Sequence, residues 1–271
     1  MIAFPNCKIN IGLRVTEKRS DGFHIIETVL TPIPWEDILE IIPSDTSETE
    51  LKSTGIRVYG NKENNLCVRA YKLLADDFQL PPIKIHLHKI LPIGAGLGGG
   101  SSDATFSLIL LNKIFNLKLT DEKLESYAAK LGSDCPFFLY NKPVLATEKG
   151  DHFQPISIKL KGLHLVVIKP RVHVNTAEAY SWIKPQKRTS SLVNELKLPL
   201  AEWKNTIDND FEKPVFERYP TIRNIKNRLY KLGAIYASMS GSGSSVYGIF
   251  EEEKHLNTYF RSSTVWQGKF N

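Results

Sequence analysis

The stretch "LPIGAGLGGGSSDAT", Leu91–Thr105, decides how this chain is interpreted. Five of the seven residues in Gly94–Gly100 are glycines, which leave the backbone N–H groups without side-chain cover. A helix with an apolar face is expected directly afterwards, marked by Ala104, Leu108, Leu111 and Phe115. Converging N–H groups at the start of a helix bind anions. The stretch therefore predicts a phosphate-binding loop.

Other interpretations of these glycines fit less well. A plain flexible loop with a Ser/Asp cap has no need of so many glycines, since each one costs chain entropy on ordering. A Walker loop requires Gly-Lys-Ser/Thr, and no lysine follows here. "GAGLGG", residues 94–99, matches the dinucleotide pattern GxGxxG, but it follows an antiparallel-looking strand instead of opening a first βαβ unit. The VAIK, HRD and DFG companions of a protein-kinase loop are absent from the sequence.

The segments around the loop predict a mixed fold. Strands are expected within 2–60 and at 83–90, 144–151 and 163–170, and an Asp-Gly hairpin turn is expected at 19–24. Helices are expected at 64–78, 120–131, 176–183, 222–232 and 252–260, and a glycine turn between two strands at 240–245. The polar segment 185–210 shows no clear period. Because strands and helices mix without regular βαβ alternation, the fold class is α+β.

Composition limits the function classes. Lys and Arg number 35 against 29 Asp and Glu, a net charge of +6 without a basic block, so a small anionic ligand is expected and nucleic acid is not. Three widely spaced cysteines indicate neither zinc nor disulfides. The sequence shows no signal peptide and no apolar run long enough for a membrane span. We expect a cytoplasmic protein without membrane association, as a monomer or homodimer.

Three motifs in chain order resemble those of the GHMP kinases, the galactokinase, homoserine, mevalonate and phosphomevalonate kinase superfamily. They are "PNCKINIGL" at 5–13, "PIGAGLGGGSSDA" at 92–104 and "MSGSGSSVYGIF" at 239–250. A further set is similar to the branch that phosphorylates a cytidine-diphosphate-linked methylerythritol: "DGFH" at 21–24, "NNLCVRA" at 64–70, "LGSDCPFF" at 131–138 and "NDFE" at 209–212. The resemblance spans essentially the whole chain.

This resemblance implies two domains and a reaction. Residues 1–156 would form a ribosomal protein S5 domain 2-like domain with the ATP loop, and 157–271 a ferredoxin-like domain, with the active site in the cleft between them. ATP and Mg²⁺ would serve as cofactors for phosphorylation of a small-molecule alcohol. Two alternatives stay open: another GHMP kinase, which the DGFH turn disfavours, and a catalytically silent nucleotide-binding regulator, which intact Lys8 and Asp134 disfavour.

Asp134 and Lys8 are the candidate catalytic residues. Asp134 stands in "GSDCPFF", where a carboxylate among apolar neighbours is costly unless it is paired. A Lys8 ammonium nearby would keep it ionised and stabilise charge on the attacking oxygen. The resemblance assigns a base and its partner to these two positions. A purely structural ion pair is the alternative.

The ATP-binding residues are expected in and around the loop. They are Asn65, Lys89, Pro92, Ile93, Gly94, Ala95, Gly96, Leu97, Gly98, Gly99, Gly100, Ser101, Ser102 and Asp103. Two of these have ordinary alternatives, which are a solvated strand lysine for Lys89 and a helix cap for Asn65. Ser102 or Asp103 is a possible neighbour of Mg²⁺, but the sequence does not identify the metal ligands.

A second group is expected to bind the cytidylylated substrate. Phe23 and Tyr180 are candidates to stack on the cytosine and His24 to contact its pairing edge, while Asn10 and Thr176 are expected near polar groups of the substrate. Related kinases often have Tyr where this chain has Phe23, which keeps the ring and loses the hydroxyl. Ordinary core packing is the alternative for the two aromatic residues.

Overall fold

The alternation of Ile83, Ile85 and Leu87 produces strand β6 (Ile83–Lys89), which buries all three side chains on one face. In the computed structural model, which describes residues 1–270, β6 belongs to a sheet of order β1-β4-β6-β5. It pairs antiparallel with β4 and parallel with β5. The other strands are β1 (Ile2–Ala3), β4 (Ile38–Pro43) and β5 (Glu50–Gly55).

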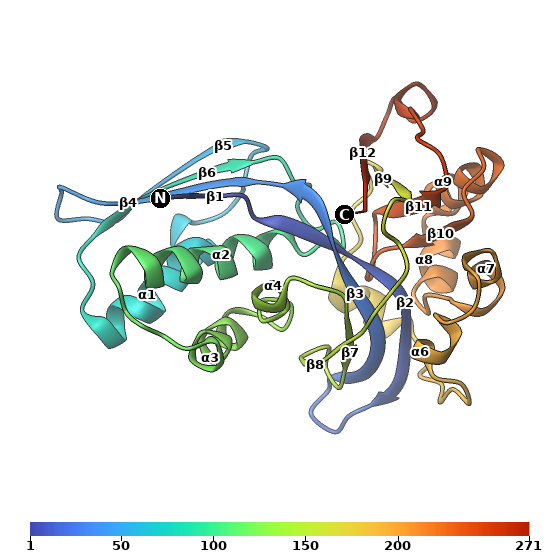
Figure 1. Ribbon diagram of the computed structural model, residues 1–271, viewed down its shortest axis with the longest axis horizontal. Coiled ribbons are helices and arrows are strands. Elements are labelled where there is room, and N and C mark those ends of the chain that lie inside the picture. Colours follow the sequence, from blue (N-terminus) through green and yellow to red (C-terminus); the bar gives the residue numbers. More distant parts are fainter. Residues whose placement is uncertain (271) are drawn as a thin grey trace. The chain divides into compact units, whose positions relative to one another are not determined.

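Helices cover one face of this sheet, as Figure 1 shows for α1 and α2. They are α1 (Leu66–Phe78), α2 (Gly99–Ile114), α3 (Asp121–Leu131) and α4 (Phe137–Tyr140), with a 3₁₀ turn η1 (Lys62–Asn64) before α1. Thr120 caps α3 by accepting a hydrogen bond from the Lys123 N–H, as the sequence predicts. A shared apolar core joins β4 and β6 to the helices, with Ile41, Leu87, Leu74 and Leu108 among its buried members.

A second sheet has the order β2-β3-β7-β8. Its strands are β2 (Asn6–Lys18), β3 (His24–Glu36), β7 (Val144–Thr147) and β8 (His152–Pro155). The predicted hairpin turn joins β2 to β3, with Gly22 at φ +86°. The Arg19 N–H donates to the Phe23 carbonyl across this turn (2.8 Å). The left-handed conformation explains why a glycine follows Asp21.

A third, antiparallel sheet has the order β10-β11-β9-β12. Its strands are β9 (His164–Lys169), β10 (Tyr236–Met239), β11 (Val246–Phe250) and β12 (Thr264–Lys269). Helices α8 (Glu212–Arg218) and α9 (Pro220–Lys231) share an apolar core with this sheet. In that core, Ile222, Ile225 and Leu229 of α9 lie with Val166 and Ile168 of β9. The predicted glycine turn at 240–245 connects β10 to β11.

One expectation needs correction, and one segment left open receives its structure. The helix predicted at 252–260 is wrong, because this segment holds only a 3₁₀ turn η3 (Asn257–Tyr259) before β12 pairs with β9. The unassigned segment 185–210 contains short elements: α6 (Leu192–Glu195), η2 (Leu200–Glu202) and α7 (Trp203–Thr206), after α5 (Thr176–Ser181). The α+β class is confirmed. No helix within residues 1–270 is long and apolar enough to cross a membrane.

The chain divides into two compact units that alternate along the sequence. Unit 1 comprises Met1–Cys7, Trp35–Ile93 and Gly98–Asn141, and unit 2 comprises Lys8–Pro34, Gly94–Leu97 and Lys142–Asn271. Strands β2 and β3 each contribute residues to both units. A single division at 156/157 does not describe these compact units; as a boundary between family domains, it stays a prediction.

Candidate functional site

The glycine loop has the backbone that its composition predicts. Gly94, Gly96 and Gly98 have φ values of +61°, +76° and +71°, in the left-handed region that favours glycine. A Cβ at Gly96 would lie 2.1 Å from the Ser240 carbonyl oxygen, a distance that no side chain can adopt. Gly98 then caps α2 and supplies no side-chain acceptor for the first-turn N–H groups. The loop is therefore built for close backbone approach, as a phosphate cradle requires.

Lys8 lies directly against the central part of this loop in unit 2. Its Nζ donates to Asn10 Oδ1 (2.7 Å) and to the Gly96 carbonyl (3.3 Å), and its backbone N–H donates to the Leu97 carbonyl (3.0 Å). Asn10 is 4% exposed, and its Nδ2 donates to the Thr28 hydroxyl (3.1 Å). The amide of Asn10 is thus committed to orienting Lys8, which favours a positioning role over the substrate contact that the sequence predicts.

The Gly-Ser turn at 240–245 meets the same part of the loop. The Ser240 hydroxyl donates to the Gly96 carbonyl (2.8 Å), and the Ser245 N–H donates to the Ala95 carbonyl (3.2 Å). Thr176 Oγ1, at the start of α5, lies 3.0 Å from the Ser242 hydroxyl. The structure therefore brings the three family motifs into one hydrogen-bonded cluster within unit 2, with Thr176 beside it.

Asn209 holds the Gly-Ser turn through hydrogen bonds to its backbone, and it was not predicted as a site residue. Its Nδ2 donates to the carbonyls of Met239 and Gly241 (2.8 Å each), while its Oδ1 accepts the Phe211 N–H (2.9 Å). The signal was present, because "NDFE" contributed to the resemblance. Sequence alone gave it no role, since both of its carbonyl partners lie about thirty residues away.

Lys89 is buried between two carboxylates in unit 1. Its Nζ donates to Asp37 and, at 2.6 Å, to Asp103 Oδ2, and the lysine is 4% exposed. Burial lowers the pKa of Lys89, but the two carboxylates outweigh it and raise the pKa overall. This placement favours a supporting role beneath the loop over the direct ATP contact that the sequence predicts for Lys89 and Asp103.

Asp103 lies in surroundings that disfavour its charged form. Burial raises its pKa to about 7, with Asp37 adding to the rise and Lys89 opposing it. Its second oxygen, Oδ1, is buried without a hydrogen-bond partner among the described residues, as is the Ser102 hydroxyl. The thiol of Cys67 on α1 also faces this group and stays neutral, because burial raises its pKa to about 12.

Asp134 stands half-buried in the link between α3 and α4. The link is fixed to α2, because the Thr105 hydroxyl donates to the Cys135 carbonyl (2.7 Å), and the Cys135 N–H donates to the Gly132 carbonyl (3.1 Å). Asp134 belongs to unit 1 and Lys8 to unit 2. Their pairing therefore stays a prediction.

Two of the predicted cytosine-binding residues lie together in unit 2. The rings of His24 and Tyr180 stack with their centroids 5.0 Å apart and an interplanar angle of 21°. Tyr180 also meets Phe211 edge-on at 4.8 Å. Burial, with a contribution from Lys18, lowers the pKa of His24, so its ring is neutral at pH 7. Phe23 is 60% exposed at the tip of the hairpin, with the Lys149 ammonium 5.5 Å from its ring centroid.

The remaining predicted ATP residues lie on the loop or beside it. Asn65 is the N-cap of α1, and its Oδ1 accepts the Cys67 N–H (2.9 Å), which matches the structural alternative for this residue. Its contact with ATP stays a prediction. Pro92, Ile93 and Ala95 to Leu97 precede α2, whose first turn contains Gly99, Gly100 and Ser101.

A metal site is not identified by the side chains. Within residues 1–270, no group of three or more His, Cys, Asp or Glu side chains is arranged to hold a metal ion. Asp103, the carboxylate nearest the loop in sequence, already pairs with Lys89. The residues present therefore do not define a Mg²⁺ shell.

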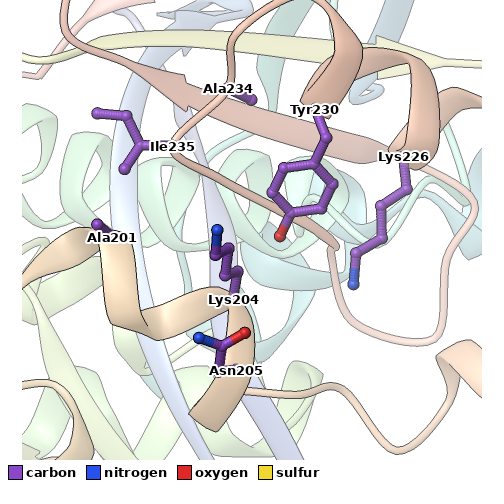
Figure 2. Close-up of a pocket in the computed structure, with 7 residues that line it drawn as sticks. All are labelled: Ala201, Lys204, Asn205, Lys226, Tyr230, Ala234 and Ile235. Atoms are coloured by element: carbon purple, nitrogen blue, oxygen red, sulfur yellow. The ribbon is translucent and has the colours of Figure 1, made fainter.

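A separate groove of about 510 Å³ lies in unit 2 (Figure 2). The short elements η2 and α7, helix α9 and the segment directly before β10 line it, through Ala201, Lys204, Asn205, Lys226, Tyr230, Ala234 and Ile235. Lys226 is paired with Glu212 (2.6 Å). None of the predicted site residues lines this groove.

Comparison with protein families gives two matches. The family model described as "GHMP kinases N terminal domain" matches residues 65–142, and "GHMP kinases C terminal" matches residues 195–259. The first match contains the glycine loop and Asp134, and the second contains Asn209 and the Gly-Ser turn. The resemblance seen in the sequence motifs is therefore confirmed at the level of the family.

Individual relatives match over the whole chain. The 4-diphosphocytidyl-2-C-methyl-D-erythritol kinase of Bacteroides fragilis is 55% identical over 270 residues, which cover 98% of each chain. The protein of that name from Parabacteroides distasonis is 47% identical over 273 residues, 100% of each. A crystal structure of 4-(cytidine 5'-diphospho)-2C-methyl-D-erythritol kinase matches with a TM-score of 0.82 at 29% identity, covering 99% of this chain and 98% of that one. A homoserine kinase from Cytophaga hutchinsonii, at 18% identity and a TM-score of 0.70 with 98% and 95% covered, shares the fold.

Proposed function

Because the chain belongs to the GHMP kinases and, within them, to the 4-diphosphocytidyl-2-C-methyl-D-erythritol kinase family, we propose that it phosphorylates the 2-hydroxyl of 4-diphosphocytidyl-2-C-methyl-D-erythritol with ATP. This reaction belongs to the non-mevalonate route to isoprenoid precursors. The observation that carries the proposal is the cluster of Lys8, the Gly96 backbone and Ser240, which joins the three family motifs.

Asp134 and Lys8 take the catalytic roles in this proposal. Asp134 accepts the proton of the attacking hydroxyl while the hydroxyl oxygen bonds to the γ-phosphorus of ATP. The bond between that phosphorus and the bridging oxygen of ADP breaks, and its electron pair leaves with ADP. Lys8 stabilises the charge that develops on the attacking oxygen. Asn10 supports this role, because its Oδ1 holds the Lys8 ammonium at 2.7 Å. A cation held in one orientation needs no reorganisation during the reaction.

The glycine loop binds the ATP phosphates through its backbone. The N–H groups of the loop and of the first turn of α2 supply donors and the positive end of the helix dipole. Mg²⁺, which is typical of such kinases, neutralises phosphate charge when it is bound.

The cytidine moiety is assigned to the hairpin tip and the His24–Tyr180 stack. A neutral imidazole offers one donor and one acceptor, which suits the pairing edge of cytosine. The lowered pKa of His24 supports this assignment, because the ring does not become charged near pH 7. The exposed ring of Phe23 provides a stacking surface, and the Lys149 ammonium beside it adds charge complementary to a diphosphate.

The test is an ADP-release assay with MgATP and one alcohol at a time. Release with the cytidylylated methylerythritol alone supports the proposed substrate. Release with mevalonate, homoserine or galactose instead would keep the kinase class and overturn the substrate. No ADP release with any of the four alcohols, together with measurable ATP binding, would favour the alternative of a catalytically silent nucleotide-binding regulator.

Replacement of the base gives the sharper result. Asp134→Asn should lower kcat by about 10²–10⁴-fold, the usual contribution of a general base, while ATP still binds. Asp76→Asn, at an exposed position on α1, is the matched control and should retain normal turnover. Turnover of Asp134→Asn within tenfold of the unchanged protein would contradict the role of Asp134 as a base.

A further inference from the structure

A buried carboxylate ties together the two ends of the glycine loop. Asp37, at the junction of β3 and β4, is 0% exposed. Its Oδ1 accepts the backbone N–H groups of Ile90 (2.5 Å) and Leu91 (2.8 Å), the residues where β6 turns into the loop. Its Oδ2 accepts a hydrogen bond from Lys89. One carboxylate therefore fixes both the backbone and the last side chain of β6 on the entry side of the loop.

Lys89 connects Asp37 to the other end of the loop, where α2 begins. Its Nζ donates to Asp103 Oδ2 (2.6 Å) in the first two turns of α2. A Cβ at Gly99, the first residue of α2, would lie 3.3 Å from this ammonium. The lysine thus lies directly under the backbone where the helix begins, and all of these residues belong to unit 1.

We propose that Asp37 is a positioning residue for the nucleotide, acting through Lys89 and Asp103 to set the separation of the two ends of the phosphate loop. The proposal rests on the proposed function, since it takes ATP as the ligand of the loop. Backbone donors hold a phosphate well only when they stay within a fraction of an ångström of their bound positions. A loop rich in glycine cannot fix its own geometry, because its residues have the most conformational freedom to lose.

Asp37→Asn tests this role selectively. The remaining carbonyl oxygen can still accept the Ile90 and Leu91 N–H groups, but the amide nitrogen cannot accept a hydrogen bond from Lys89. We expect the Kd and KM for ATP to rise about tenfold or more. The KM for the cytidylylated alcohol should stay within about twofold, and kcat within about threefold. Asp77→Asn on α1, whose carboxylate accepts the Tyr127 hydroxyl, is the matched control.

The measurements are ATP binding by titration calorimetry without the alcohol, steady-state kinetics for both substrates, and the thermal midpoint. A lower midpoint with an unchanged Kd for ATP would show a merely structural role and overturn the proposal. An equal rise in both KM values would also overturn it. Should Asp37→Asn not fold, Asp37→Asn/Lys89→Met/Asp103→Asn removes all three charges of the buried cluster together and should show the same rise in the Kd for ATP.

The same data separate this inference from the proposed function. If the unchanged protein binds ATP but phosphorylates none of the alcohols, a weaker Kd in Asp37→Asn still supports the positioning role while the proposed function fails. If the unchanged protein binds no ATP, both are overturned.

Discussion

At the scale of single residues, Gly96 is the most constrained position of the site. Its φ of +76° is strained for any other residue, and a Cβ there would meet the Ser240 carbonyl oxygen at 2.1 Å. That oxygen belongs to backbone, so it cannot rotate away. Gly96→Ala should therefore displace the Gly-Ser turn from the loop and abolish ATP binding, measured by calorimetry.

Gly162→Ala separates this contact from the backbone strain. Gly162 also has a positive φ of +88°, but a Cβ there would meet no atom within 4 Å. The control should lose only about 1 kcal/mol of stability, the typical cost of a strained left-handed residue, and keep normal ATP affinity. Equal affinities in the two variants would contradict the steric argument for Gly96.

Residue types were easier to predict than their partners. The glycines could be selected from the sequence because their chemistry is local, and Lys8 and Asn10 because they stand in the motif "PNCKINIGL". Asp37 could not, because its partners Ile90 and Leu91 lie more than fifty residues away and only the sheet brings them together. For the same reason, the sequence could not show that Lys89 is buried between carboxylates.

At the scale of elements, the packing of α2 against the end of β6 should depend on pH. The folded-state pKa of Asp103 is raised to about 7 from 3.8, with Lys89, Asp37 and neutral Cys67 facing it. The folded protein therefore holds this proton more tightly than the unfolded chain. The resulting stability is fully present below about pH 4 and is lost as the pH rises through 7. Asn at this position does not titrate.

Asp103→Asn should consequently gain stability relative to the unchanged protein as the pH rises. Between pH 5 and pH 8, the difference in the free energy of unfolding should move in favour of the variant by up to about 3 kcal/mol. Urea unfolding at both pH values measures it. Ser107→Ala, one turn further along α2, removes a hydroxyl but no titratable group. Its difference in the free energy of unfolding from the unchanged protein should therefore be the same at both pH values. A constant offset for Asp103→Asn would refute the assigned pKa shift.

Periodicity predicted elements where local pattern decides them. β6 and α3 have clean alternation or a capped helical stripe, and both were predicted within one or two residues. The helix prediction for 252–260 failed although Leu256 and Phe260, four residues apart, are both buried; the segment forms only the 3₁₀ turn η3. The short helices of 192–206 could not be predicted either. Arg14 on β2 helps to hold them, through Ser190 (3.0 Å) and Glu195, and this contact is not local.

At the scale of the whole molecule, the order of the motifs predicted the fold better than any boundary in the sequence did. One apolar core forms around α1, α2 and β6, and another forms around α9, β9 and β11. The compact units around them alternate along the chain, since β2 and β3 contribute to both. Unit 2 is accordingly not a continuous segment, because it includes Lys8 and Gly94–Leu97 as well as Lys142–Asn271.

Ligand binding should be visible in the stability of the molecule, independently of catalysis. At an ATP concentration of 100 times Kd, binding to the folded state alone adds about 2.7 kcal/mol, and this should raise the thermal midpoint by about 5–10 °C. Asp134→Asn should show the full rise, because a base for the alcohol does not contribute to holding ATP. Gly96→Ala should show none, and Gly162→Ala should match the unchanged protein. A missing rise in Asp134→Asn would mean that this residue serves nucleotide binding, and its loss of turnover would then say nothing about proton transfer.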